Sequence, residues 1–293
     1  MIRGVVVSLT TDGEEFQLSQ AAAAESAARR LGLPCEVIYA DRNAILQIHQ
    51  LFERIHQPEE QRPLAFVVEP VRDEGQRRLS RNAAGAGIGW LLLNHWSPYL
   101  AELRREHPTL PICSVLTDQV EAGRVQGRQI KALLPRGGTV LYVQGPATSL
   151  VEERRRGTEE EIEGAGIQLW ELSASWSEQS GEEAVLACAR LKTASLDRVD
   201  LLACQNDLMA QGARKALIAT VPELARIPVL GIDGLPSGGQ RLVAKKELAA
   251  TVVMPANADR AVELVAEWTR SGQQPPEQTR QLPEPYPPLE QSR

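Results

Sequence analysis

The chain is poor in cysteine and aromatic residues, has no excess of basic residues and contains no long apolar run. Its 293 residues include 4 Cys, 3 Phe, 4 Tyr and 5 Trp. The longest apolar runs, such as residues 90–93, are far shorter than the roughly 18 residues that a membrane-spanning helix needs. The formal net charge of −6 argues against a protein that binds a nucleic acid backbone by itself.

The rest of the composition is typical of a folded protein. Hydrophobic residues make up 43% of the chain and charged residues 24%, which excludes disorder over most of its length. A length of 293 residues corresponds to about two domains of roughly 150 residues each. We therefore expect two domains with ample material for a sizeable core.

Cysteine spacing and the N-terminus bear on metal binding and on compartment. Cys35, Cys113, Cys188 and Cys204 are widely separated and form no C-x-x-C pair. Buried free thiols are expected rather than a zinc site, and no metal or cofactor is predicted. The N-terminus leads directly into a strand pattern without the features of a secretory signal. The chain as given is therefore expected in the cytoplasm, or in the periplasm if a signal was removed.

Short apolar runs alternate with helical patterns along almost the whole chain. The predicted strands cover residues 2–9, 35–40, 64–69, 88–94, 112–117, 140–144, 167–172, 199–204, 228–232 and 250–254. The predicted helices cover residues 16–31, 43–56, 74–84, 97–106, 119–134, 149–163, 180–192, a segment from 207 onward, and 257–270. About five strand–helix units precede residue 118 and about five follow it. This pattern predicts an α/β fold with two doubly wound lobes, each a parallel sheet with helices on both faces.

Helix ends and the C-terminal tail carry local signals. The predicted caps are Gly32, Asn43, Ser97 before Pro98, and the capping boxes Ser149 with Glu152 and Ser180 with Glu183. Residues 273–293 contain six prolines, too many for a helix or a central strand. We expect an extended surface segment there, with one edge-strand contact.

The residues directly after each predicted strand are the first candidates for ligand contacts, because ligands of open α/β sheets bind beyond the carboxyl ends of the strands. These positions hold amides, carboxylates and aromatic rings: Thr10, Thr11, Asp12, Phe16, Glu69, Asn94, His95, Trp96, Thr117, Asp118, Ser173–Trp176, Gln205, Asn206, Asp207 and Asp233. They contain no recognisable catalytic constellation.

Motifs that would indicate an enzyme are absent from the sequence. There is no G-x-x-x-x-G-K-[ST] phosphate loop and no G-x-S-x-G nucleophile turn. Gly85, Gly87 and Gly89 follow a helix and precede a strand, the reverse of a dinucleotide-binding turn. His49 and His56 could share one helix face, but no third metal ligand accompanies them, and we expect a solvated or half-packed pair.

Two tryptophans stand apart from the other three. Trp90, Trp170 and Trp268 lie inside predicted strands or a helix and are expected in the core. Trp96 and Trp176 each follow a strand end, one in each half of the chain. An indole at such a position either stacks on the apolar face of a sugar ring or packs as an ordinary core residue, and position alone leaves both alternatives open.

One arginine of the run at 154–156 is separated from its neighbours. Arg155 and Arg156 have glutamates four residues further on, which predicts ion pairs on an exposed helix face. Arg154 lies near the start of the same predicted helix, and therefore near the strand ends. We keep it as a candidate ligand residue.

Three ordered motifs carry a resemblance to a known family. Gln205-Asn206-Asp207-Leu208-Met209-Ala210-Gln211-Gly212-Ala213, then Gly231-Ile232-Asp233-Gly234-Leu235-Pro236, then Leu248-Ala249-Ala250-Thr251-Val252 follow one another at the family's spacing. The chain resembles the type I periplasmic binding proteins and the related effector-binding domain of lac-repressor-like regulators. The N-terminal half agrees in its first strand ending near Phe16, in Leu31-Gly32 and in Gln47. The resemblance extends to about residue 272.

The resemblance implies two lobes joined by three hinge crossings, with a ligand enclosed as the lobes close. The crossings are expected near residues 117–118, 254–255 and 279–282. The N-terminal lobe would comprise residues 1–118 and 255–279, and the C-terminal lobe residues 119–254 and 280–293.

The resemblance also implies ligand contacts, transferred position by position. The matched positions are Asp12, Phe16, Glu69, Asn94, His95, Arg154, Trp176, Asn206 and Asp233, and Trp96 is added from its place after a strand. Asn94-His95 stands where sugar binders commonly have Asp-Arg, which removes a bidentate guanidinium contact. Met254 stands where ribose binders use a hydrogen-bonding Gln. A neutral polyol, pentose or hexose is the expected ligand, with a cationic or amine-bearing ligand as the alternative.

The resulting hypothesis is a non-enzymatic small-molecule receptor, active in transport or in transcriptional or signal regulation. Its partners would be a monosaccharide or polyol, and a membrane transporter or sensor, with a homodimer as a further expectation and no direct nucleic acid contact by this chain. The rival interpretations are a sugar-active enzyme on a two-lobed α/β frame and a ligand-free protein-interaction module. Family analogy favours sugar uptake, and that inference is associational.

Overall fold

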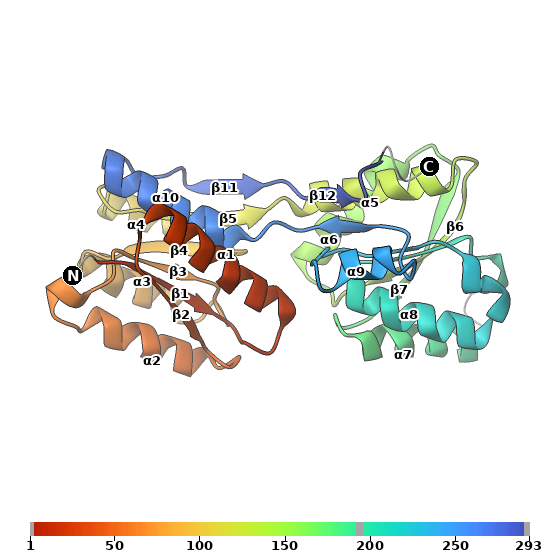
Figure 1. The fold of residues 1–293 in the computed structure, drawn as a ribbon, viewed down its shortest axis with the longest axis horizontal. Coiled ribbons are helices and arrows are strands. Elements are labelled where there is room, and N and C mark those ends of the chain that lie inside the picture. The colour runs from red at the N-terminus through yellow and green to blue at the C-terminus, as the bar shows by residue number, and fades with distance from the viewer. Residues whose placement is uncertain (1–2, 192–195, 290–293) are drawn as a thin grey trace. The chain divides into compact units, whose positions relative to one another are not determined.

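The structure, a computed structural model, describes residues 3–191 and 196–289. The described chain forms two compact units (Figure 1). Unit 1 contains the chain up to Thr117 together with Ala256–Gln281, and unit 2 contains Asp118–Pro255 together with the chain from Leu282 onward. The chain therefore passes between the units three times, at residues 117–118, 255–256 and 281–282.

Strands and helices alternate along both units. The strands are β1 (Val5–Leu9), β2 (Cys35–Tyr39), β3 (Ala65–Val68), β4 (Gly89–Leu93), β5 (Ile112–Thr117), β6 (Gly138–Gln144), β7 (Ile167–Ser173), β8 (Leu201–Cys204), β9 (Val229–Leu230), β10 (Thr251–Val253), β11 (Gln278–Gln281) and β12 (Glu284–Tyr286). The α-helices are α1 (Glu15–Leu31), α2 (Ala44–Ile55), α3 (Gln76–Gly85), α4 (Tyr99–Glu106), α5 (Gln119–Leu133), α6 (Ser149–Ile162), α7 (Glu178–Leu191), α8 (Asp207–Thr220), α9 (Gly239–Ala244) and α10 (Asn257–Ser271). Short 3-10 helices cover Glu59–Gln61, Leu196–Arg198 and Pro222–Arg226.

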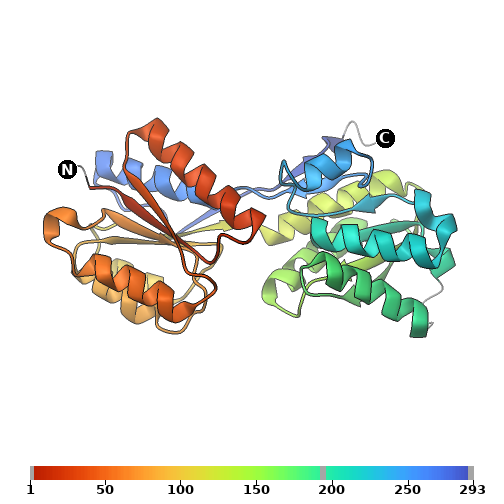
Figure 2. The ribbon, with the colours of Figure 1, turned by 60° about the horizontal axis from the view of Figure 1, so that its bottom comes forward.

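Unit 1 is a six-stranded sheet in the order β11-β5-β4-β3-β1-β2, in which every neighbouring pair is parallel. Successive strand residues face opposite sides, so each strand contributes to two cores. Val5, Val7 and Leu9 pack with α1 and α10, whereas Val6 and Phe66 belong to the core formed with α2, α3 and α4. Both faces of the sheet are therefore covered by helices, as a parallel sheet requires (Figure 2).

Unit 2 repeats this plan around a four-stranded parallel sheet in the order β7-β6-β8-β9. Helices α7, α8 and α9 cover one face, and α5 and α6 cover the other. Helices α5 and α6 are in close contact at Gly123 and Gly157. An added Cβ atom would lie 1.9 Å from the carbonyl oxygen of Arg154 at the first glycine and 1.9 Å from that of Val120 at the second. These glycines fix where α6, and with it Arg154, lies in the unit.

The predicted α/β fold of two parallel-sheet lobes joined by three crossings is confirmed. Most predicted elements begin and end within two or three residues of the observed ones. Asn43 caps α2 by accepting from the amides of Ile45 and Leu46, and Gly32 ends α1 with a φ of 68°. The predicted strand start at Ile2 and helix end at Lys192 lie outside the described residues.

Three cap predictions are wrong. The side chain that caps α6 is Thr148, which accepts from the amide of Val151, so the box at Ser149 is displaced by one residue. Helix α7 begins at Glu178, and the Ser177 hydroxyl accepts from the amide of Ser180, which lies inside the helix. Helix α4 begins after Pro98 without a side-chain cap, so Ser97 does not have the predicted role.

The proline-rich tail makes two strand pairings where one was expected. Strand β11 pairs in parallel with β5 at the edge of the unit 1 sheet. Strand β12 pairs antiparallel with β10 in unit 2, placing Pro285 opposite Val252. Both are edge positions, where a proline leaves no central ladder bond unmade.

Cysteines and tryptophans mostly lie where the sequence predicts. Cys113 and Cys204 are buried free thiols, and Cys35 is a half-buried one. Burial raises the pKa of the Cys35 thiol to about 11, so this sulfur is a poor nucleophile. Trp90 is fully buried, whereas Trp170 and Trp268 pack against the cores while remaining partly exposed. No helix in the described part of the chain is long and apolar enough to cross a membrane.

Candidate functional site

The carboxyl ends of the parallel strands collect the predicted ligand residues in each unit. Three of these residues have a backbone conformation that non-glycine residues rarely adopt: Asn94 after β4, Trp176 after β7 and Asp233 after β9, with φ of 55°, 66° and 112°. Such strained residues concentrate at functional sites, because the surrounding structure must hold them in place. The observation directs attention to these three strand ends.

In unit 1, Glu69, Asn94 and His95 line one hollow of about 280 Å³, together with Asp73 and neighbouring backbone. His95 Nε2 lies 2.6 Å from an oxygen of Asp73, which fixes the imidazole. The hollow is therefore polar and carries both carboxylates and an imidazole.

The other unit 1 candidates lie elsewhere at the same end of the sheet. Asp12 is exposed after β1, and Phe16 is half-buried in the first turn of α1. Trp96 is 41% exposed, which excludes it from the core. Among the described residues, none of these three lines the hollow beside Glu69.

Glu69 is the most perturbed carboxyl group of the hollow. Burial raises its pKa to about 7, against the opposing effect of the nearby Gln17 and Asn94 amides. Gln47 supports the backbone around it, since its Nε2 donates to the Glu69 carbonyl oxygen (2.9 Å) and its Oε1 accepts from the Val71 amide (3.0 Å). Within the described chain, Oε2 of Glu69 is a buried atom without a hydrogen-bond partner.

In unit 2, Arg154 and Trp176 form the centre of the candidate site. Arg154 is 5% exposed, and its Cζ lies 5.8 Å from the centroid of the Trp176 ring. Its Nε donates to Gln119 Oε1 (2.8 Å) and its Nη1 to the carbonyl oxygen of Gln205 (2.6 Å). Burial lowers the pKa of the guanidinium, and the Asp233 carboxylate acts in the opposite direction. By contrast, Arg155 forms the predicted exposed pair with Glu159 (2.5 Å).

Asn206 connects this pair to the start of α8. Its Nδ2 donates to the Trp176 carbonyl oxygen (2.9 Å), and its Oδ1 accepts from the Met209 amide as the helix N-cap (2.8 Å). Asp233 follows β9, exchanges backbone hydrogen bonds with the segment around Val253, and acts electrostatically on Arg154. The structure thus brings all four predicted unit 2 residues together: Arg154, Trp176, Asn206 and Asp233.

The packing of Trp176 depends on a glycine. A Cβ atom added at Gly145, directly after β6, would lie 2.2 Å from the indole ring. The amide of Gly145 in turn donates to Oε1 of the buried Gln205 (3.3 Å). The sequence motif around Asn206 pointed to Gln205 only as a strand-end residue, and its supporting role in unit 2 was not predicted.

Asp207 and Asn257 are two further polar residues whose roles were not predicted. Asp207 is buried, and its carboxylate accepts from the Gly234 amide (2.8 Å) and the Thr251 hydroxyl (2.6 Å), holding the loop that carries Asp233. Asn257 begins α10 and reads in the sequence as an ordinary helix-start residue. Its position two residues beyond the second crossing was the one available signal.

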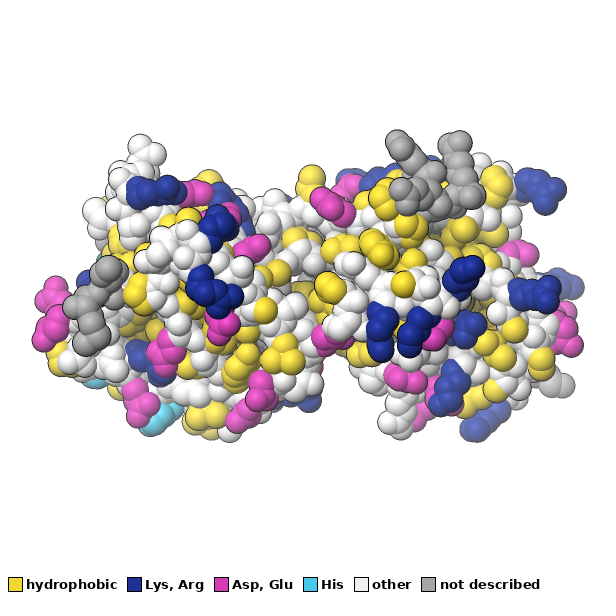
Figure 3. All heavy atoms as spheres, viewed as in Figure 1, with side chains coloured by type: hydrophobic (Ala, Val, Ile, Leu, Met, Phe, Trp, Pro, Cys, Tyr) yellow, Lys and Arg dark blue, Asp and Glu magenta, His cyan; other side chains and the backbone are white. Residues whose placement is uncertain are grey.

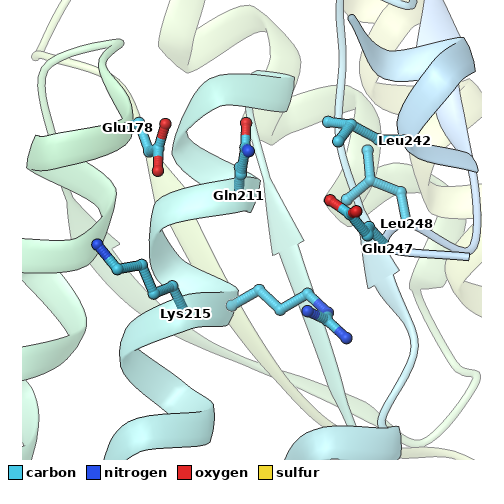
Figure 4. Close-up of a pocket in the computed structure, with 7 residues that line it drawn as sticks. Glu178, Gln211, Lys215, Leu242, Glu247 and Leu248 are labelled. Atoms are coloured by element: carbon cyan, nitrogen blue, oxygen red, sulfur yellow. The ribbon is translucent and has the colours of Figure 1, made fainter. Parts of the chain in front are cut away.

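A second hollow of about 190 Å³ lies on unit 2, away from these residues. Figure 4 shows Glu178 of α7 and Gln211 and Lys215 of α8 on one side, and Leu242, Glu247 and Leu248 on the other. Lys215 Nζ is paired with Glu182 at 2.8 Å. None of the predicted ligand residues lines this hollow.

The surface and the titratable groups give no sign of other chemistry. On the face shown in Figure 3, basic and acidic side chains are interspersed over both units. Among the described residues, no three His, Cys, Asp or Glu side chains lie close enough to hold a metal ion. The candidate site is thus one of amides, carboxylates, a guanidinium and an indole, which are groups suited to binding hydroxyls and an apolar ring face.

The sequence matches the periplasmic binding protein domain family over residues 5–269. The chain belongs to this family. No curated protein sequence matches it. Many solved structures do match, and those named below are under 25% identical, so they speak for the fold of this family member alone.

Three of the solved structures illustrate the likeness. A periplasmic solute-binding protein of an ABC transporter from Actinobacillus succinogenes 130z, with bound D-allose, is 19% identical with a TM-score of 0.80, covering 99% of each chain. A solute-binding protein from Bacillus halodurans C-125 with bound myo-inositol is 19% identical with a TM-score of 0.76, covering 99% of this chain and 96% of the other. The arabinose-binding component from Shewanella sp. ANA-3 is 16% identical with a TM-score of 0.77, covering 99% and 93%.

Proposed function

We propose that this protein is a non-enzymatic receptor for a monosaccharide or polyol, which it binds with residues of both units and encloses by hinge closure. The observation that carries the proposal is the unit 2 cluster, in which a buried guanidinium lies over an indole ring beside a carboxylate and an amide. An indole accepts the apolar face of a sugar ring, and the polar groups accept and donate to its hydroxyls.

Unit 1 supports the same class of ligand. Its hollow presents Glu69, Asn94 and His95, which can exchange hydrogen bonds with several hydroxyl groups. The solute-binding proteins with similar folds carry D-allose, myo-inositol or arabinose. A neutral polyhydroxylated ligand is therefore the proposal, and an ABC transporter is the proposed partner. Regulation of transcription or of a sensor is the alternative outcome for the same receptor.

Thermal unfolding against a panel of sugars tests the proposal. The panel contains D-allose, D-galactose, L-arabinose, D-fructose, myo-inositol and glycerol, each at millimolar concentration. A ligand held at about 1,000 times its Kd adds about 4 kcal/mol, a shift of several degrees in Tm. The variants Asp233→Ala and Trp176→Ala should lose the shift, whereas Arg156→Ala, on an exposed helix face, should keep it.

A flat response across the panel would contradict the sugar-receptor proposal. Steady formation of a product from any bound sugar would instead favour the rival enzyme interpretation. An unchanged ligand shift in both Asp233→Ala and Trp176→Ala would show that the site assignment is wrong even if the protein is a receptor.

A further inference from the structure

Asn257 lies where the three chain passages of unit 1 come together. It is fully buried and follows the second crossing by two residues. Its Nδ2 donates to the hydroxyl of Thr117, the last unit 1 residue before the first crossing (2.9 Å), and its Oδ1 accepts from Gln281, the last before the third crossing (2.9 Å). Its Nδ2 also donates to Oδ1 of Asn94 (2.5 Å).

This network sets the orientation of the Asn94 amide. Donation runs in one direction, from Gln281 to Asn257 and from Asn257 to Asn94. The Asn94 carbonyl oxygen is therefore held by Asn257, and its Nδ2 group is left for the other side. An amide that faces a carboxyl group with N–H rather than C=O is also the electrostatically favoured arrangement.

Two buried atoms of the unit 1 hollow lack a hydrogen-bond partner among the described residues. They are Nδ2 of Asn94, a donor, and Oε2 of Glu69, an acceptor. The neighbouring amides of Gln17 and Asn94 both act on the Glu69 carboxyl group, so the two side chains are close to one another. A buried polar atom left unpartnered is costly, which makes the pair a demand for a ligand group.

A single hydroxyl group answers that demand. It donates its proton to Oε2 of Glu69 and accepts from Nδ2 of Asn94. An ammonium group has donors only, so it would pair with Glu69 and oppose the Asn94 N–H. A hydrogen or methyl at the same place would leave both atoms unpaired.

We propose that Asn257 is a specificity-determining positioning residue: by holding the carbonyl oxygen of Asn94, it makes the Glu69–Asn94 pair select a ligand hydroxyl over an ammonium group. The inference rests on the proposed function, because it concerns one position of the bound sugar or polyol. Asn257 acts through Asn94 and itself has no further hydrogen-bonding capacity to offer, since both of its polar atoms are engaged.

The charges around the pair agree with this choice. Glu14 faces Glu69 and raises the pKa of its carboxyl group, and Asp73, Arg72 and His95 line the same hollow. His95 is paired with Asp73 at 2.6 Å. A hydroxyl donor stabilises the ionised carboxylate, so binding should tighten as the pH rises through about 7.

The test inverts the donor and acceptor pattern. In Asn257→Asp, carboxylate oxygens replace the donor that faces Asn94, so the Asn94 amide must turn its N–H toward residue 257 and its C=O toward Glu69. The pair then consists of two acceptors and prefers an ammonium group. The probes are the tightest binder among D-allose, L-arabinose and myo-inositol, and its derivatives in which one hydroxyl at a time is replaced by hydrogen or by an amine.

Isothermal titration calorimetry of the full chain at pH 7.5 gives the decisive comparison. In wild type, the amine derivative at one position should bind at least 10-fold more weakly than the parent. In Asn257→Asp that derivative should bind at least as tightly as the parent, while derivatives at other positions keep their wild-type ranking. A merely structural role would weaken all ligands alike. An unchanged ranking at every position would overturn the proposal.

A second variant covers failure of Asn257→Asp to fold. In Asn94→Asp, Asn257 still donates to one carboxylate oxygen and the other oxygen faces Glu69, so the same inversion is expected. Retention of the wild-type preference in a folded Asn94→Asp would overturn the proposal. If wild type binds none of the parent sugars or derivatives, the proposed function fails, and the inference that rests on it fails with it. Glu53→Gln, on the exposed side of α2, is the matched control and should keep the wild-type ranking.

Discussion

The two units present strand ends of the same kind but in opposite states of completion. In unit 2, the buried Arg154 is already held by Gln119, Gln205 and the Trp176 ring, and Asn206 uses both ends of its amide on protein groups. In unit 1, Glu69 and Asn94 each keep a buried polar atom without a partner in the described chain. The unit 2 half is thus arranged by the protein itself, whereas the unit 1 half is completed by a ligand.

The difference separates stability from selectivity. Groups that are fully partnered in the folded chain contribute to its stability, so their removal should weaken folding and binding together. Groups that are left unpartnered oppose folding, so their removal should stabilise the free protein while it weakens binding. The predictions below test this division, beginning with the largest effect.

Arg154→Ala should have the largest effect. It removes a buried guanidinium and leaves the Gln205 carbonyl oxygen unpaired, at a cost of about 3 kcal/mol in the free energy of unfolding. Urea unfolding measures this loss, and calorimetry should show at least a 100-fold loss of sugar affinity. Arg156→Ala, whose side chain is 60% exposed on the same helix, should change stability by less than about 0.5 kcal/mol. Equal effects of the two substitutions would contradict the special place given to Arg154.

Glu69→Gln should have the opposite sign. The pKa of Glu69 is raised to about 7 in the folded chain, so its contribution to stability is full below the unfolded value of 4.5 and declines as the pH rises through about 7. At pH 8 the variant should therefore be more stable than wild type by up to about 3 kcal/mol, at roughly 1.4 kcal/mol per pKa unit. At pH 5 the two proteins should differ little.

Urea unfolding at both pH values checks the Glu69 prediction. Glu53→Gln serves as the control, because Glu53 is exposed on α2 and should shift stability equally at pH 5 and pH 8. A wild-type-like pH profile in Glu69→Gln would mean that the unit 1 carboxyl group is not the strained element described here.

Gly145→Ala should disturb unit 2 alone. The added Cβ atom would lie 2.2 Å from the Trp176 ring, so the indole must move, at a cost of about 2 kcal/mol typical of overpacking. The intrinsic fluorescence should change and sugar affinity should fall. Gly85→Ala, where an added Cβ meets no atom within 4 Å, should leave both unchanged. Unaltered fluorescence in Gly145→Ala would show that Trp176 is not fixed by the protein.

Thr148→Ala should have the smallest effect and separates two neighbouring residues. Thr148 caps the helix that carries Arg154, so its loss should cost about 1 kcal/mol in the free energy of unfolding. Ser149→Ala, at the position that the sequence favours, should cost less than half as much. The reverse order, measured by urea unfolding, would restore the capping box predicted from the sequence.

The fold was predictable because its signals are local. Buried parallel strands are short apolar runs, and Val5–Leu9 or Gly89–Leu93 stand out from the helical pattern on each side. Caps were less predictable, because Thr148 and Ser149, or Ser177 and Ser180, offer the same chemistry within a few residues. Which one caps depends on where the preceding strand releases the chain.

The candidate site was predictable by position more than by role. The strand-end rule and the family motifs selected Glu69, Asn94, Arg154 and Asp233, but not the network that supports them. Asn257 could not be recognised from the sequence, because its role requires three chain passages, more than 20 residues apart, to meet around one amide. The left-handed conformation of Trp176 was equally hidden, since Trp has no preference for it.

The most direct test of the account is calorimetric titration of D-allose, L-arabinose and myo-inositol into wild type and into one variant from each unit, Asn94→Ala and Asp233→Ala. The account predicts that wild type binds at least one of the three and that both variants bind it at least 10-fold more weakly. Wild type that binds none of them would contradict the receptor proposal. A variant that binds as tightly as wild type would show that its unit contributes nothing to the site.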